Sequence, residues 1–179
     1  FLNYSYKKGY IRGINSTITA LPSAQDDNGS LQSIGCYLEQ YQTPETPFVV
    51  TNGDVLTDVH YGELLDFHLQ NSAMATMAVR VHEWQNPFGV VETQGIEITG
   101  YEEKPISRTY INAGVYVIEP SSINILIKSV PCDMPDLFKS IQKQEMRTIA
   151  YLIHEHWLDI GRPDDLLNAT AVSKLWSEK

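Results

Sequence analysis

The sequence has few cysteines, few basic side chains and no long apolar run. Its two cysteines, Cys36 and Cys132, lack the spacing of a metal site, so we expect free thiols in a reducing cytoplasm. No segment has the length and apolarity of a membrane span, and no basic-then-apolar leader opens the chain. Lys and Arg number 13 against 22 Asp and Glu, and the net charge of -9 disfavours binding to nucleic acid or to anionic membranes.

The composition is that of an ordinary globular domain. With 179 residues, of which 42% are hydrophobic and 20% charged, the chain is long enough for one compact core. There is no internal repeat and no low-complexity linker. We therefore expect residues 1–179 to form a single domain. Because the first residue is Phe1 and not Met, we expect that domain to be incomplete at its N-terminus.

The hydrophobic pattern alternates between strands and helices, which predicts an α/β fold with a mixed sheet. Asp58 is a candidate cap for the helix that follows it, and the strand at 48–51 is expected to be buried on both faces. The expected strands cover 17–21, 48–51, 73–81, 110–118, 147–153 and 156–159, with a β-rich hairpin over 89–92 and 96–102. The expected helices cover 31–41, 61–69, 121–127, 135–144 and 163–176.

Two aspartates follow expected strands at opposite ends of the sequence. Asp54 ends the string Phe-Val-Val-Thr-Asn-Gly-Asp, and Asp159 lies in Trp-Leu-Asp-Ile-Gly. Each has a plain structural explanation, since Asn-Gly-Asp is a common turn and Asp159 is a candidate cap for the last helix. Ligands of open α/β sheets nevertheless collect at the carboxyl ends of strands, and two carboxylates there suit a divalent metal that contacts phosphate. The pair predicts a metal site.

The string Glu102-Glu103-Lys104-Pro105 places acid and base side by side. Alone, it is most often a solvated turn. Pro105 restricts the backbone before it, so we expect Lys104 to project in a reproducible direction, and an ammonium group is a compact phosphate ligand. Glu103 is suited to accept hydrogen bonds from sugar hydroxyls.

Small residues interrupt two of the expected strands. Gly89 opens one strand, and Asn112-Ala113-Gly114 breaks another. A glycine at such a position indicates either a bulge and close packing or the approach of a ligand to the backbone. The five histidines show no zinc spacing, and His154 and His156 are expected at the surface.

These motifs together resemble those of the sugar-1-phosphate nucleotidyltransferases, the enzymes that make nucleoside-diphosphate sugars. The resemblance extends from about residue 31 to residue 169. Residues 134–138 and 157–162 look closest to a bacterial subgroup that activates hexosamine phosphates for surface glycans, often with guanine nucleotides. The matching blocks, all in the family's order, are 48–54, 87–91, 101–105, 111–116 and 157–163.

The resemblance implies a three-layer, Rossmann-like domain with a mixed, mostly parallel sheet and a β-rich insertion. It implies a nucleoside triphosphate and a sugar 1-phosphate as substrates, with release of pyrophosphate. Asp54 and Asp159 would hold Mg²⁺, and Lys104 would contact the sugar phosphate. The other implied substrate contacts are Gly53, Gly89, Glu103 and Asn112.

The sequence departs from the family at its start. The family's glycine-rich phosphate loop has no counterpart here, and residues 1–11 resemble the second βα unit of the family. Gln32 stands where the family usually has a glycine that lets the base approach. We therefore expect the chain beginning at Phe1 to bind sugar phosphate weakly and to turn over little.

Two other functions stay open at this point, and so does a homo-oligomer. A metal-dependent glycosyltransferase would use an Asp-x-Asp pair, and the second aspartate is missing after Asp54. A sensor domain that binds sugar phosphate without catalysis would explain Gln32 and the absent loop.

Overall fold

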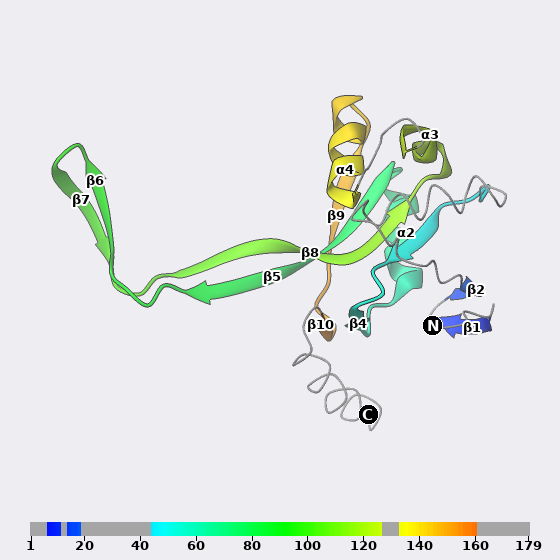
Figure 1. Cartoon of the computed structure of the whole chain (residues 1–179), viewed down its shortest axis with the longest axis horizontal. Coiled ribbons are helices and arrows are strands. Elements are labelled where there is room, and N and C mark those ends of the chain that lie inside the picture. The colour runs from blue at the N-terminus through cyan, green and yellow to red at the C-terminus, as the bar shows by residue number, and fades with distance from the viewer. Residues whose placement is uncertain (1–6, 12–13, 19–43, 127–132, 161–179) are drawn as a thin grey trace, which may run out of the picture.

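The computed structural model describes residues 7–11, 14–18, 44–126 and 133–160, and a four-stranded sheet forms its centre (Figure 1). The strand order is β3-β8-β5-β9. β8 runs antiparallel to both β3 and β5, whereas β5 and β9 are parallel, so the predicted mixed sheet is confirmed. The four strands are β3 (Phe48–Thr51), β5 (Ala75–Gln85), β8 (Ile106–Ile118) and β9 (Thr148–Leu152).

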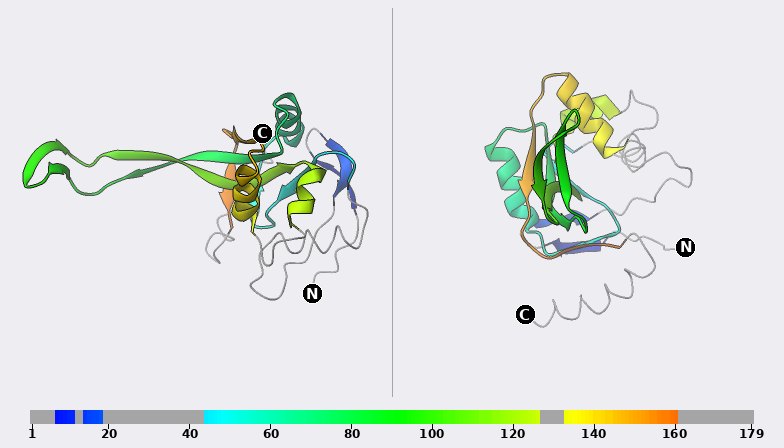
Figure 2. Two further views of the ribbon diagram at one scale, coloured as in Figure 1. Left: turned by 90° about the horizontal axis from the view of Figure 1, so that it is seen from above. Right: turned by 90° about the vertical axis from the view of Figure 1, so that its left-hand side faces the viewer.

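Helices cover both faces of the sheet, as the end-on view in Figure 2 shows. Because side chains alternate along a strand, neighbouring residues of β8 face opposite helices. Tyr116 packs in the core with α4 (Met134–Lys143), while Val115 and Val117 pack in a second core with α2 (Tyr61–Gln70). The predicted three-layer arrangement is confirmed. No helix among the described residues has the length and apolarity needed to span a membrane.

Shorter elements complete the described chain. The hairpin predicted over 89–102 is present, and the helix predicted over 121–127 is a 3-10 turn followed by one helical turn. The helices predicted over 31–41 and 163–176 lie outside the described residues, as does the end of the strand predicted over 17–21. The shorter elements are β1 (Lys7–Ile11) with β2 (Ile14–Ile18), β4 (Val55–Thr57) with β10 (Trp157–Asp159), β6 (Val90–Gln94) with β7 (Glu97–Glu102), η1 (Pro120–Ser122) and α3 (Ile123–Leu126).

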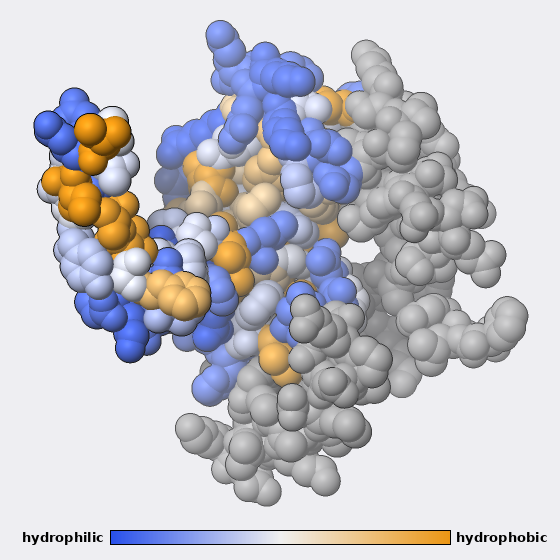
Figure 3. Space-filling view, turned by 60° about the vertical axis from the view of Figure 1, so that its left-hand side comes forward, coloured by the Kyte–Doolittle hydropathy of each residue, from blue (hydrophilic) through white to orange (hydrophobic). Residues whose placement is uncertain are grey.

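A long two-stranded arm projects from the sheet and carries the β6–β7 hairpin at its tip (Figures 1 and 2). β9 pairs with β5 only as far as Val79, and β3 pairs with β8 only from Val115. Beyond those points the described parts of β5 and β8 pair with each other alone. Apolar side chains along the arm are therefore exposed; they include Phe88, Ile96, Ile98, Tyr101, Ile106 and Tyr110. Figure 3 shows hydrophobic residues on the visible face of the arm's tip.

Two local predictions are wrong. Asp58 does not cap α2, because the helix begins at Tyr61 and the cap position falls two residues after Asp58. The Asp58 N–H instead donates to the His156 carbonyl beside the β4–β10 pairing. The cap is His60, whose Nδ1 accepts a hydrogen bond of 3.1 Å from the Glu63 N–H. β3 is only partly buried, and Thr51 at its end is exposed, because β3 has a partner among the described strands on one side only.

Candidate active site

The two aspartates predicted to form one site lie on paired segments at the end of the sheet. Asp54 follows β3 and immediately precedes β4, while Asp159 is the last residue of β10. In the antiparallel pairing of these two short strands Asp159 stands opposite Val55, and the Ile160 N–H donates to the Asp54 carbonyl over 2.7 Å. The fold thus pairs the backbone segments that carry the two aspartates, which come from opposite ends of the sequence, and both aspartates are exposed.

The turn before Asp54 is open. A Cβ placed on Gly53 would have no atom within 4 Å. Neither Asn52 nor Gly53 has a positive φ, so the turn does not depend on the left-handed conformations that Asn and Gly favour. The backbone beside Asp54 is therefore accessible to a substrate.

A bulge in β8 lies beside both aspartate segments. The register of β5 against β8 shifts between Met77 and Val79, and Gly114 has a φ of 71°. Carbonyls at a bulge are taken out of the regular ladder and need other donors. The Gly114 carbonyl accepts from the Asn52 N–H (2.8 Å), and the Ala113 carbonyl accepts from the Trp157 indole N–H (2.7 Å).

Asn112 is an exposed residue of β8, and both ends of its side-chain amide are hydrogen-bonded within the protein. Its Nδ2 donates to the Tyr116 hydroxyl over 2.7 Å, and its Oδ1 accepts from the Gly114 N–H over 2.9 Å. Burial raises the pKa of Tyr116, and the negative charges of Asp133 and Asp54 raise it further, whereas the bond from Asn112 opposes them. One proton of the Asn112 amide and one lone pair of its oxygen are left over for a sugar hydroxyl.

The donor set at this edge suits a hard divalent cation. Mg²⁺ is usually held by one or two carboxylates together with water and substrate phosphates, which is what two exposed aspartates beside an open turn can offer. Within the described ranges no group of three or more His, Cys, Asp or Glu side chains is placed to hold a metal. An ion at Asp54 and Asp159 would therefore rely on water or on substrate oxygens to complete its coordination.

The glycine and glutamate predicted to bind sugar lie together on the arm. A Cβ on Gly89 would collide with the Tyr101 ring and would stand 2.8 Å from a Glu103 carboxylate oxygen. The Tyr101 hydroxyl donates to that same carboxylate, and this bond raises the pKa of Tyr101. A side chain at position 89 would therefore displace the exposed Tyr101 and Glu103 side chains, and the two expected sugar contacts form one cluster.

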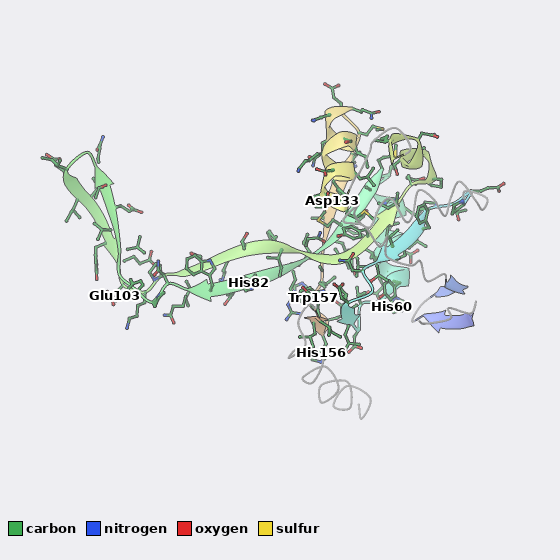
Figure 4. The ribbon with its side chains drawn as sticks, in the orientation of Figure 1. His60, His82, Glu103, Asp133, His156 and Trp157 are labelled. Carbon is green, nitrogen blue, oxygen red and sulfur yellow. The ribbon has the colours of Figure 1, made fainter. Side chains whose placement is uncertain are left out.

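This arm cluster does not lie next to the aspartates. Figure 4 shows Glu103 at the outer end of the arm, whereas Trp157 lies in the body. An extended strand advances about 3.3 Å per residue, so Lys104 lies on the order of 25 Å along the arm from Asn112. In this structure Lys104 therefore lies on the arm, away from the two aspartates.

The backbone of Lys104 also differs from its prediction. A residue before proline is normally extended. Lys104 instead has a φ of 48°, in the left-handed region. The turn is held by the Asn86 N–H, which donates to the Pro105 carbonyl over 3.0 Å, and by the Gln85 side chain, which donates to the Lys104 carbonyl over 3.2 Å.

Sequence reasoning assigned no role to three residues in the body of the protein, away from the arm. Trp157 shares a face of β10 with Asp159, and this period of two was a usable signal. Asp133 accepts a hydrogen bond from the Asp136 N–H as the cap of α4, and the Asp-x-Pro-Asp string indicates such a cap. Tyr116 offered no signal, because its role depends on the pairing of β8.

Comparison with curated proteins identifies relatives among enzymes of nucleotide-sugar synthesis. A mannose-1-phosphate guanyltransferase of Yarrowia lipolytica is 32% identical over 132 residues, which cover 72% of this chain and 36% of the relative. A mannose-1-phosphate guanyltransferase of Saccharomyces cerevisiae is 27% identical over 173 residues, covering 93% of this chain and 46% of the relative. The chain thus spans less than half the length of either relative.

Solved structures share the fold. A putative glucose-1-phosphate thymidylyltransferase from Bacillus anthracis, in complex with a sucrose, has a TM-score of 0.59 and 20% identity, over 83% of this chain and 62% of that one. HddC from Yersinia pseudotuberculosis, complexed with GMP-PN, has a TM-score of 0.55 and 16% identity, over 83% of this chain and 64% of that one. The family model described as nucleotidyl transferase matches residues 2–174. The chain therefore belongs to the nucleotidyl transferase family.

Proposed function

We propose that the protein containing this chain transfers a nucleoside monophosphate from a nucleoside triphosphate to a sugar 1-phosphate. The observation that carries the proposal is the β4–β10 pairing, which sets Asp159 opposite Val55 and joins Ile160 to Asp54 by a backbone bond of 2.7 Å. One carboxylate in the turn before β4 and another at the end of β10 are suited to a magnesium–triphosphate substrate.

The reaction needs no protein nucleophile. An oxygen of the sugar phosphate attacks the α-phosphorus, a new oxygen–phosphorus bond forms, and the bond to the β-phosphate breaks in line, with pyrophosphate as the leaving group. A Mg²⁺ ion bound at this site would neutralise the charge on the phosphate oxygens. Asp54 and Asp159 would hold that ion and so would orient the triphosphate, and the open backbone at Gly53 leaves room for the substrate.

The identity of the substrates is a finer proposal. The names of the curated relatives favour guanosine triphosphate and mannose 1-phosphate, while the strings at 134–138 and 157–162 favour a hexosamine 1-phosphate for surface-glycan synthesis in the cytoplasm. Glu103, Gly89 and Asn112 are the proposed sugar contacts. Lys104 reaches the sugar phosphate in this scheme only if the arm and the paired β4 and β10 segments that carry the two aspartates approach each other during binding.

Pyrophosphate release tests the proposal. The native full-length protein is given Mg²⁺, the common nucleoside triphosphates and a panel including mannose 1-phosphate and hexosamine 1-phosphates. Asp54→Asn and Asp159→Asn should each lower the rate on the order of 100-fold or more, because the phosphate charge loses its counterion. Asp66→Asn removes an exposed carboxylate of α2 and is the matched control.

Other outcomes would contradict the proposal in different ways. Release that is unchanged in both variants would remove the aspartates from the mechanism. Sugar-phosphate binding without release would identify a sensor domain, and sugar transfer from a nucleoside-diphosphate sugar would identify a glycosyltransferase. Lys104→Gln should raise the KM for sugar phosphate, and an unchanged KM would exclude Lys104 from the site.

A further inference from the structure

Both segments that carry an aspartate are hydrogen-bonded to the β8 bulge. Asn52 stands two residues before Asp54, and its N–H bonds to the Gly114 carbonyl. Trp157 stands two residues before Asp159, and its indole N–H bonds to the Ala113 carbonyl. Successive carbonyls of one bulge therefore hold the two segments that carry the carboxylates.

The attachment of Asp159 depends more strongly on a side chain than that of Asp54. The Asn52 bond extends the β3–β8 ladder, which any residue with a backbone N–H can do. β10 has only three residues, and β4 is its strand partner in the sheet. The Trp157 side chain is its link to β8, and it ends on a carbonyl of Ala113, a residue that is fully buried.

Trp157 is itself held in place by Arg80. The Arg80 guanidinium lies 5.9 Å from the centre of the Trp157 ring, a distance typical of a cation–π contact. The same guanidinium donates to the Glu155 carbonyl over 3.1 Å, which fixes the chain just before β10. Arg80, Trp157 and Ala113 thus form a continuous support behind the strand that ends at Asp159.

We infer that Trp157 is a positioning residue, which sets Asp159 at the distance from Asp54 that a shared divalent ion requires. The inference rests on the proposed function, because it assumes that both aspartates bind the ion. Groups that orient metal ligands from outside the coordination sphere commonly change metal affinity when they are lost. Trp157 acts here through the backbone of β10, and it has no role as a ligand.

Binding of Mn²⁺ alone, followed by water-proton relaxation without substrates, tests the inference. Trp157→Phe keeps an aromatic ring at this position but removes the indole N–H, so Mn²⁺ should bind roughly 10-fold more weakly. Trp84→Phe, in a half-exposed tryptophan of the arm, is the matched control and should leave binding unchanged. The thermal midpoint of each variant is measured as well, because a purely structural role would lower the midpoint and leave Mn²⁺ binding intact at low temperature.

The outcomes separate this inference from the proposed function. If Trp157→Phe binds Mn²⁺ like the wild type while Asp54→Asn does not bind it, the positioning role is refuted and the metal site stands. If Asp54→Asn and Asp159→Asn both bind Mn²⁺ normally, the metal site itself is refuted. If Trp157→Phe does not fold, Arg80→Met decides, since it removes the cation that holds the ring, and unchanged Mn²⁺ binding in that variant would overturn the inference.

Discussion

Gly114 is the position at which a single methyl group should have the largest effect on the candidate site. Its φ of 71° is a conformation that side chains rarely adopt, and a Cβ there would lie 2.9 Å from Val55 Cγ2 and 3.0 Å from Asn52 Nδ2. A left-handed backbone costs a residue with a Cβ about 1–2 kcal/mol. Forcing an extra carbon into a packed place costs about 1–3 kcal/mol more. Gly114→Ala should therefore lower the free energy of unfolding by about 2–5 kcal/mol.

Two other glycines separate the two causes. Gly95 has a φ of 66° but open space around its Cβ position, so Gly95→Ala should show only the backbone cost of about 1–2 kcal/mol or less. Gly53 has neither a positive φ nor a neighbour within 4 Å, so Gly53→Ala should be neutral or slightly stabilising, by under about 1 kcal/mol.

The free energy of unfolding of all three variants and the wild type is measured by urea titration followed by circular dichroism. Variants are compared only where the dependence of this free energy on urea concentration is the same, so that their denatured states are equivalent. The order of destabilisation should be Gly114→Ala, then Gly95→Ala, then Gly53→Ala. A Gly114→Ala variant that is no less stable than Gly95→Ala would refute the close approach of Val55 and Asn52 to the bulge. A loss at Gly53 as large as that at Gly114 would refute the open turn beside Asp54.

Two further predictions concern the helices. His68 is fully buried, with its Nδ1 2.8 Å from Thr76 Oγ1, and burial lowers its pKa despite the opposing Glu119 carboxylate 3.4 Å away. Its contribution to stability is therefore complete above the unfolded pKa of about 6.5 and is lost as pH falls through the lower folded value. Thermal midpoints measured from pH 7.5 to 5 should fall less steeply in His68→Gln than in the wild type or in the exposed-site control His82→Gln. Equal pH dependence of the midpoint in all three proteins would contradict this prediction. Asp133→Ala removes the cap that accepts from the Asp136 N–H over 3.0 Å, and should lower the free energy of unfolding by about 0.5–2 kcal/mol in urea titrations. A variant whose free energy of unfolding equals or exceeds that of the wild type would show that the cap is not stabilising.

The sheet and its helices were largely readable from the sequence, because their signals are local. The apolar run at 48–51, the alternation at 110–118 and the helical spacing at 61–69 and 135–144 reappear as β3, β8, α2 and α4 with small shifts at their ends. The cap of α2 was misread because Asp58 is a better cap than His60 by residue preference alone. The helix begins at Tyr61, which places the cap two residues after Asp58, and the Asp58 N–H bonds beside the β4–β10 pairing instead.

The order of blocks in the sequence was sufficient to predict the family and to select Asp54 and Asp159 as partners. Chain order cannot show how far two such segments lie apart in space, and here only the pairing of β4 with β10 makes the two aspartates neighbours. The tertiary structure alone also decided that Gly89 and Glu103 lie on an arm away from these aspartates, because the length over which β5 and β8 pair is set by long-range backbone bonds. The same reason explains why Trp157 was missed. Its indole bonds to a carbonyl that is available only because β8 bulges at Ala113 and Gly114, and that bulge is a property of the assembled sheet.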